Sequence, residues 1–149
     1  MYGRCDDINN LNIDLLQQKS TDIIYARKLL NKYAKIPIRA FLADETVISA
    51  ANYQLIVAIE AAQNICNHLA ARVAKKAPTS YSDCYLILRD EGIISDELGS
   101  SLAKMAKFRN LLVHKYGNID NAIVYNIISS GQLDYFNLFL EAVKKLVEE

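Results

Sequence analysis

Apolar residues recur every three or four positions along most of the chain, which is the period of an amphipathic α-helix. The pattern is clearest over residues 44–75, where one seam of apolar and small side chains comprises Ile48, Ala51, Leu55, Ala58, Ala62, Cys66, Leu69 and Val73. Small side chains in such a seam allow a partner helix to approach closely. The seam therefore predicts a long helix that packs against another helix.

The same period predicts a first helix over residues 7–35, with a weak point near residues 19–21. Pro37 disfavours helical backbone at the residue before it, so a turn is expected there. A short helix is expected over residues 82–90, where Ser80 and Asp83 resemble a capping box with Asp in the usual Glu position.

Three further helices are expected towards the C-terminus. The first is capped by Ser95 and stops at Gly117, the second is capped by Asp120 and ends near Gly131, and the third spans residues 133–147. Residues 123–128 look strand-like but have no pairing partner. The fold class is therefore all-α: an antiparallel helical bundle of about four long helices with several short ones.

The composition fits one compact domain over residues 1–149. Hydrophobic residues make up 52% of the 149 residues and charged residues 23%, which is enough apolar material for a sizeable core. Three cysteines without a CxxC spacing indicate neither a disulfide framework nor a zinc site. No stretch resembles a signal peptide or a membrane span, so we expect a cytoplasmic protein with no membrane partner.

The charge is neutral overall but unevenly distributed. Residues 19–39 carry six Lys or Arg against one Asp, and residues 101–116 carry four against no acid. Segregated charge of this kind can form a basic face on a neutral protein. Two interpretations stay open for each cluster: a surface that contacts nucleic acid, or a helix face whose lysines are solvated.

The segment Phe108–Tyr116 carries the candidate chemistry. Arg109 is a permanent cation with a fork-shaped guanidinium suited to phosphate, and His114 can exchange a proton near neutral pH. On a regular helix these two residues lie about 140° apart around the axis and about 7.5 Å apart along it, whereas Arg109 and Tyr116 differ by only about 20°. Either the helix unwinds before Gly117 and turns the histidine, or a second copy of the chain completes the site.

Cleavage of RNA through its own 2′-hydroxyl requires a base, a cation on the phosphate and an acid for the leaving oxygen. A twofold dimer would bring two copies of Arg109 and His114 into one cleft and separate acid from base, so we expect a homodimer acting on RNA. The simpler alternative is that both side chains cap carbonyls at the helix end and interact with its dipole.

The sequence Arg109–Tyr116, R-N-L-L-V-H-K-Y, resembles the RX4HXY signature of the HepT toxins in the HEPN superfamily. The similarity extends from about residue 40 to the C-terminus and includes Ala58–Ala62 with Ile65 and His68, Pro78 with Ser80 and Tyr81, Leu86–Leu88, Gly92–Ile94 and Met105–Phe108. The resemblance implies a dimeric helical bundle and a metal-independent endoribonuclease without cofactors.

The resemblance also assigns roles to individual residues. It implies that Arg109 and His114 are catalytic and that Asn110 positions the phosphate of the RNA. It further implies a minimal nucleotidyltransferase antitoxin as partner, which neutralises the toxin by transferring AMP to Tyr116. An anionic nucleotide beside a basic cleft would repel RNA phosphate.

Other polar residues admit both a functional and a structural interpretation. Glu60, Asn64 and His68 lie four residues apart and form a polar stripe, either supporting the site or facing solvent. A metal site at His68 is not expected, because companion ligands at suitable spacing are missing from the sequence.

Two alternatives to the ribonuclease stay open at this stage. The chain could be a non-catalytic HEPN docking subunit, or a substrate-positioning subunit of a nucleotidyltransferase complex. RNA cleavage that depends on His114 separates the enzyme from both.

Overall fold

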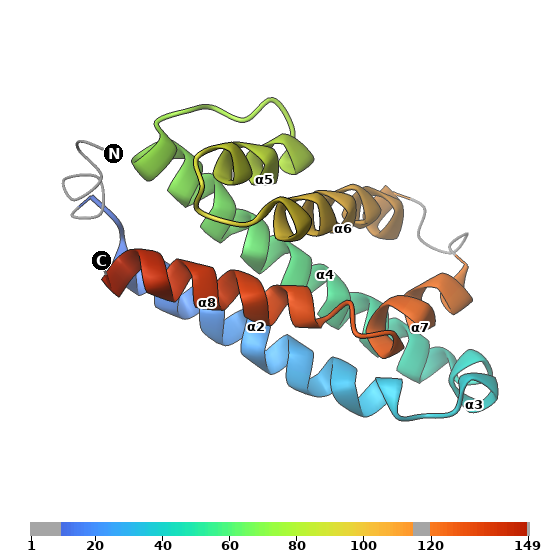
Figure 1. The fold of residues 1–149 in the computed structure, drawn as a ribbon. Coiled ribbons are helices and arrows are strands. Elements are labelled where there is room, and N and C mark those ends of the chain that lie inside the picture. The colour runs from blue at the N-terminus through green and yellow to red at the C-terminus, as the bar shows by residue number, and fades with distance from the viewer. Residues whose placement is uncertain (1–9, 115–119, 149) are drawn as a thin grey trace.

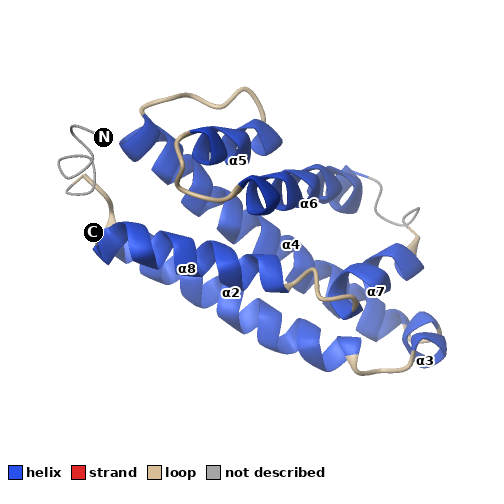
Figure 2. Cartoon of the chain, in the orientation of Figure 1, coloured by secondary structure: helices blue, strands red, loops and turns tan. Residues whose placement is uncertain are grey.

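The computed structural model describes residues 10–114 and 120–148, and all regular structure in these ranges is helical (Figure 2). The all-α prediction is therefore confirmed. The α-helices are α2 (Ile13–Ala34), α3 (Ile38–Leu42), α4 (Glu45–Leu69), α5 (Tyr81–Asp90), α6 (Asp96–His114), α7 (Asn121–Ser129) and α8 (Asp134–Glu148). A π-helical turn, η1 (Ala70–Ala74), extends α4 by five residues.

The long helices α2, α4, α6 and α8 run in alternating directions, and α5 pairs with α6 as a helical hairpin (Figure 1). The most extensive packing joins α2 to α4, followed by α5 with α6. Gly99 lets α5 and α6 approach closely, since a Cβ at this position would lie 3.0 Å from Cβ of Arg89. The site residues on α6 are thus held against both α4 and α5.

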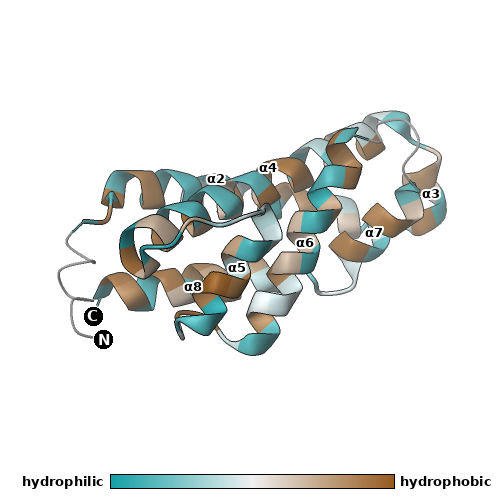
Figure 3. Cartoon of the chain, turned by 90° about the horizontal axis from the view of Figure 1, so that it is seen from above, coloured by the Kyte–Doolittle hydropathy of each residue, from teal (hydrophilic) through white to brown (hydrophobic). Residues whose placement is uncertain are grey.

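The apolar seam predicted for α4 forms the centre of the core. All its members from Ala51 to Val73 are buried, and Ile48 is partly buried. Hydrophobic and hydrophilic residues alternate along the helices, as expected for amphipathic elements of a bundle (Figure 3). In the part of the chain that the structure describes, no helix is both long and apolar enough to cross a bilayer.

Side-chain caps fix the beginnings of several helices. Asp44 accepts hydrogen bonds from the backbone N–H groups of Thr46 and Val47 at the start of α4. The predicted caps Ser80, Ser95 and Asp120 are confirmed, each accepting a bond from a backbone N–H in the first turn of its helix. These bonds satisfy donors that a helix start otherwise leaves unpaired.

The carboxylate of Asp83 departs from the expected capping box. It accepts from the backbone N–H of Thr79 at 2.9 Å, one residue before the cap Ser80. The reciprocal half of the box is present, because Asp83 N–H donates to Oγ of Ser80 at 3.1 Å. The box therefore also fixes the approach of the chain to α5.

The first helix differs from the prediction at two places. Residues 10–12 are not helical, and α2 begins at Ile13 after the cap Asn12. The expected weak point is wrong as well: Ser20 and Thr21 donate their hydroxyls to carbonyls one turn earlier, and the helix continues through them. Such back-bonding satisfies the hydroxyls within the helix.

Two short helices complete the bundle. The strand-like stretch 123–128 is helical in α7, because Val124, Ile127 and Ile128 lie on one face and are buried together. Helix α3, which the periodicity did not predict, buries Phe41 against the ring of Tyr125, with ring centroids 5.0 Å apart. A segment of five residues is too short to show a helical period.

Candidate active site at the end of α6

Arg109 lies in the last third of α6 and its side chain is held by two other helices. Its Nε donates to Oε1 of Glu60 on α4, and its guanidinium carbon lies 5.2 Å from the ring centroid of Tyr81 on α5. Only 19% of the Arg109 side chain is exposed, against 33% for Glu60. An ion pair and a cation–π contact therefore fix the guanidinium before any ligand binds.

The guanidinium keeps donors available for a ligand. Besides Nε, only Nη1 has a partner among the described residues, donating to Oδ1 of Asn110 at 3.3 Å. Arginine has five N–H donors, so two are engaged and three have no hydrogen-bond partner among the described residues. Asn110 itself is exposed, which places its amide group at the rim of the site.

His114 is the last residue of α6 and is exposed. The helix is continuous from Arg109 to His114, so the two side chains keep the divergence of about 140° that a regular helix imposes. Of the two alternatives, unwinding of the helix before Gly117 is not seen up to His114, and residues 115–117 lie outside the described residues. Asn110 lies four residues before His114 and shares its face of the helix.

Tyr116, the expected AMP acceptor, lies outside the described residues, as do Lys115 and Gly117. The described chain resumes just before α7.

The polar stripe on α4 is divided by its contacts. Glu60 pairs with Arg109, Asn64 is exposed, and His68 accepts a hydrogen bond from the backbone N–H of Asn12 at 2.9 Å. Burial, followed by the charge of Arg72, lowers the pKa of His68, which favours the neutral ring needed to accept this bond. The contact joins the end of α4 to the beginning of α2.

Two tyrosines of α5 were missed as neighbours of the site by reasoning from the sequence. Tyr81 covers the guanidinium of Arg109, and Tyr85 is buried in the core against Phe139. Burial raises the pKa of Tyr85 well above its usual value, with smaller contributions from charges that include Glu60. The available signal was weak: Tyr81 directly follows the cap Ser80, which fixes its place in the first turn of α5.

Comparisons with known proteins identify the family and the fold. Residues 23–143 match the family model described as Ribonuclease HepT-like. The mRNA nuclease HepT of Shewanella oneidensis is 28% identical over 104 residues, which cover 70% of this chain and 77% of the relative. A relative from Archaeoglobus fulgidus is also 28% identical, over 121 residues that cover 81% of this chain and 89% of its own length.

Among solved structures, the tri-AMPylated Shewanella oneidensis HEPN toxin in complex with MNT antitoxin superposes with a TM-score of 0.81. It is 25% identical, and the match covers 91% of this chain and 99% of that chain. The segment carrying Arg109 lies inside the matched region of the family model. The chain belongs to the Ribonuclease HepT-like family.

Proposed function

We propose that the protein is a toxin of a toxin–antitoxin system and a metal-independent endoribonuclease. The observation that carries the proposal is the guanidinium of Arg109, which Glu60 and Tyr81 hold in place and which keeps free donors, on the helix that also ends with the exposed His114. Membership in the HepT-like family supports it. The relative from Shewanella oneidensis is named as an mRNA nuclease, which supports RNA as the substrate class.

The proposed reaction uses the ribose of the substrate as nucleophile. The 2′-hydroxyl loses its proton to a base and its oxygen attacks the adjacent phosphorus, while the bond to the 5′-oxygen breaks and an acid protonates that oxygen. The products are a 2′,3′-cyclic phosphate and a free 5′-hydroxyl. His114 supplies proton transfer, and Arg109 stabilises the charge on the crowded phosphate. Asn110 positions the phosphate.

A second copy of the chain completes the proposed site. On the continuous helix Arg109 and His114 point in different directions, so one copy presents them to different sides of α6. A twofold axis near the end of α6 would place two of each residue around one cleft. Leu111 and Val113 support this location, since both apolar side chains are exposed beside the site residues, by 46% and 38%.

Control by AMPylation is the second part of the proposal. The solved relative is described as tri-AMPylated and in complex with MNT antitoxin, which supports a minimal nucleotidyltransferase as partner. Tyr116 is assigned as the acceptor from its place in the RX4HXY signature. Co-expression with that partner should add AMP to the unsubstituted chain but not to Tyr116→Phe, as read by mass spectrometry. AMP found on another residue would contradict the assignment.

The reaction is tested with purified protein and a labelled RNA in the presence of EDTA. We expect cleavage that leaves cyclic phosphate ends and that falls by roughly 10²–10³-fold in Arg109→Ala, which lacks the phosphate-stabilising cation. Unchanged circular dichroism is the control for folding. A protein that forms a tight complex with its partner but never cleaves RNA would instead be a docking subunit.

The shared cleft is tested by mixing two inactive variants. Arg109→Ala and His114→Ala, exchanged into mixed dimers, should regain part of the activity, because one cleft then holds one Arg109 and one His114 from opposite copies. Mixed dimers that stay inactive would contradict a site shared between two copies.

A further inference from the structure

The second half of α2 carries a basic surface that the proposed reaction does not use. Lys28, Lys32 and Lys35 are exposed and lie four and then three residues apart, so they project from one side of the helix over about two turns. Together with Asn31 and with Asn137 of α8 they line a hollow of about 550 Å³. The surface is thus concave and carries amide groups as well as ammonium groups.

The charge of this hollow is uncompensated. Among the described residues, no acidic side chain lines it and none forms an ion pair with its three lysines. Arg27, the fourth basic residue of the lining, differs because it is paired with Asp134. Three unpaired cations held close together repel one another, and a polyanion relieves that repulsion.

An aromatic ring lies beside the lysines. Tyr25 precedes Lys32 by seven residues and therefore differs from it by only about 20° around the helix axis. Its side chain is 60% exposed. Lysines interleaved with an exposed aromatic ring are the combination with which proteins bind single-stranded nucleic acid, since phosphates pair with the lysines and a base stacks on the ring.

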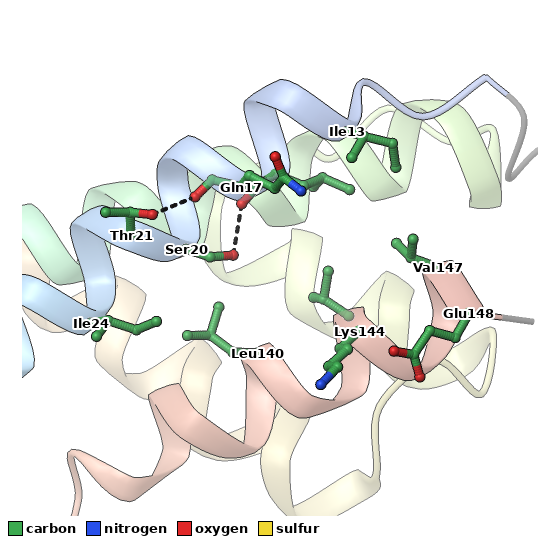
Figure 4. Close-up of a pocket in the computed structure, with 11 residues that line it drawn as sticks. Ile13, Gln17, Ser20, Thr21, Ile24, Leu140, Lys144, Val147 and Glu148 are labelled. Carbon is green, nitrogen blue, oxygen red and sulfur yellow. Dashed lines mark hydrogen bonds between the residues drawn. The ribbon is translucent and has the colours of Figure 1, made fainter.

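A neighbouring hollow on the other half of α2 marks the limit of this surface. It lies between α2 and α8, measures about 570 Å³, and is lined mainly by aliphatic side chains such as Leu140 and Val147 (Figure 4). The two hollows meet at Ile24. Lys144 of the apolar hollow shares its lining with the carboxylate of Glu148, so among the described residues this hollow carries no excess positive charge. A polyanion is therefore expected on the half of α2 that follows Ile24.

We propose that Tyr25, Lys28, Lys32 and Lys35 form a second RNA-binding site, which holds the single-stranded backbone of the substrate away from the scissile phosphate. This inference rests on the proposed ribonuclease function. The lysines neutralise successive phosphates, Asn31 and Asn137 hydrogen-bond to the backbone, and a base stacks on Tyr25. Binding there contributes affinity and is independent of the sequence cleaved.

The test measures binding of a 30-nucleotide single-stranded RNA at several salt concentrations, with His114→Ala as the uncleaving background. Adding Lys28→Ala and Lys32→Ala should weaken binding roughly tenfold and lower the slope of log K against log salt by about 1.4, or 0.7 for each lost phosphate contact. Tyr25→Ala should weaken binding by a similar factor, and Tyr25→Phe should restore it because Phe retains the stacking face.

The matched control is Lys144→Ala with Lys145→Ala, which removes the same charge from exposed positions on α8. It should leave the salt slope unchanged. The inference would be overturned if the α2 double variant and the α8 double variant had equal salt slopes. It would also be overturned if the α2 double variant bound RNA normally and lost affinity only for a protein partner. A tetranucleotide tests cleavage without the second site. If the unsubstituted protein cleaves it, the proposed ribonuclease function stands even where the second RNA-binding site fails.

Discussion

The two histidines of the chain stand at the ends of neighbouring helices in opposite environments. His68, near the end of α4, accepts a hydrogen bond from a backbone N–H of another segment, and burial lowers its pKa. His114, at the end of α6, is exposed and lies four residues after Asn110. The same side chain thus joins two helices in one place and is available to a ligand in the other.

The difference shows how contacts separate a histidine held by the fold from one that is proposed to act on a substrate. Both histidines lie on apolar helices, and both occur in the stretches that resemble the HepT toxins. They differ in their contacts: the ring of His68 accepts a bond from the backbone N–H of Asn12, whereas His114 is exposed. The ring nitrogen of His68 is already engaged with the backbone, whereas the imidazole of His114 is exposed and can contact a substrate.

Alanine substitution of the two histidines should give opposite results. His114→Ala should lower the cleavage rate by about 10²–10⁴-fold, since it removes proton transfer, and should leave the unfolding midpoint in urea unchanged. His68→Ala should keep the cleavage rate within a few-fold but lower the free energy of unfolding by about 1 kcal/mol, because the Asn12 N–H loses its acceptor. Equal activity losses in both variants would contradict the distinction.

Glu60→Gln sharpens the comparison by testing how the site next to His114 is held. The amide keeps the size of the side chain but loses its charge, so Arg109 is held less firmly and cleavage should fall roughly tenfold. Asn64→Asp is the control, because Asn64 is exposed one turn further along α4. If Glu60→Gln changes stability but not the rate constant, the ion pair is purely structural.

The smallest effect concerns the pH dependence of stability. The pKa of His68 is lower in the folded chain than its value of about 6.5 in the unfolded chain, so the unfolded chain takes up the proton first as the pH falls. The contribution is therefore fully present above about pH 6.5 and is lost as the pH falls through the folded pKa. Urea midpoints measured across this range should decline more steeply for the unsubstituted chain than for His68→Gln.

Much of the fold was predictable because it depends on local rules. The seam of α4 and the caps Ser80, Ser95 and Asp120 follow from spacing and from hydrogen-bonding chemistry within a few residues. The start of α2 was missed although a local cap marks it, since Oδ1 of Asn12 accepts from the backbone N–H of Leu15 at 3.1 Å. The second bond of Asn12, from its N–H to His68, joins positions 56 apart and could not be read from the local sequence.

The site was predictable only in part for the same reason. The residues of the motif could be named, but the pairing of Arg109 with Glu60 joins positions 49 apart and depends on how α6 is rotated against α4. Periodicity identifies the face of a helix and not the partner that it meets. The role of Tyr81 was missed because its local sequence does not distinguish a ring that stacks on an arginine from a ring that packs in the core.

The close approach of Gly99 and Arg89 links the packing of the α5–α6 hairpin to the geometry of the site. Position 99 lies ten residues before Arg109, yet any side chain there would press on the Cβ of Arg89 and push α5 outwards. Tyr81 is carried by the same helix, so its ring would move off the guanidinium. A larger residue at position 99 would therefore need a compensating change in α5 to keep Tyr81 over Arg109.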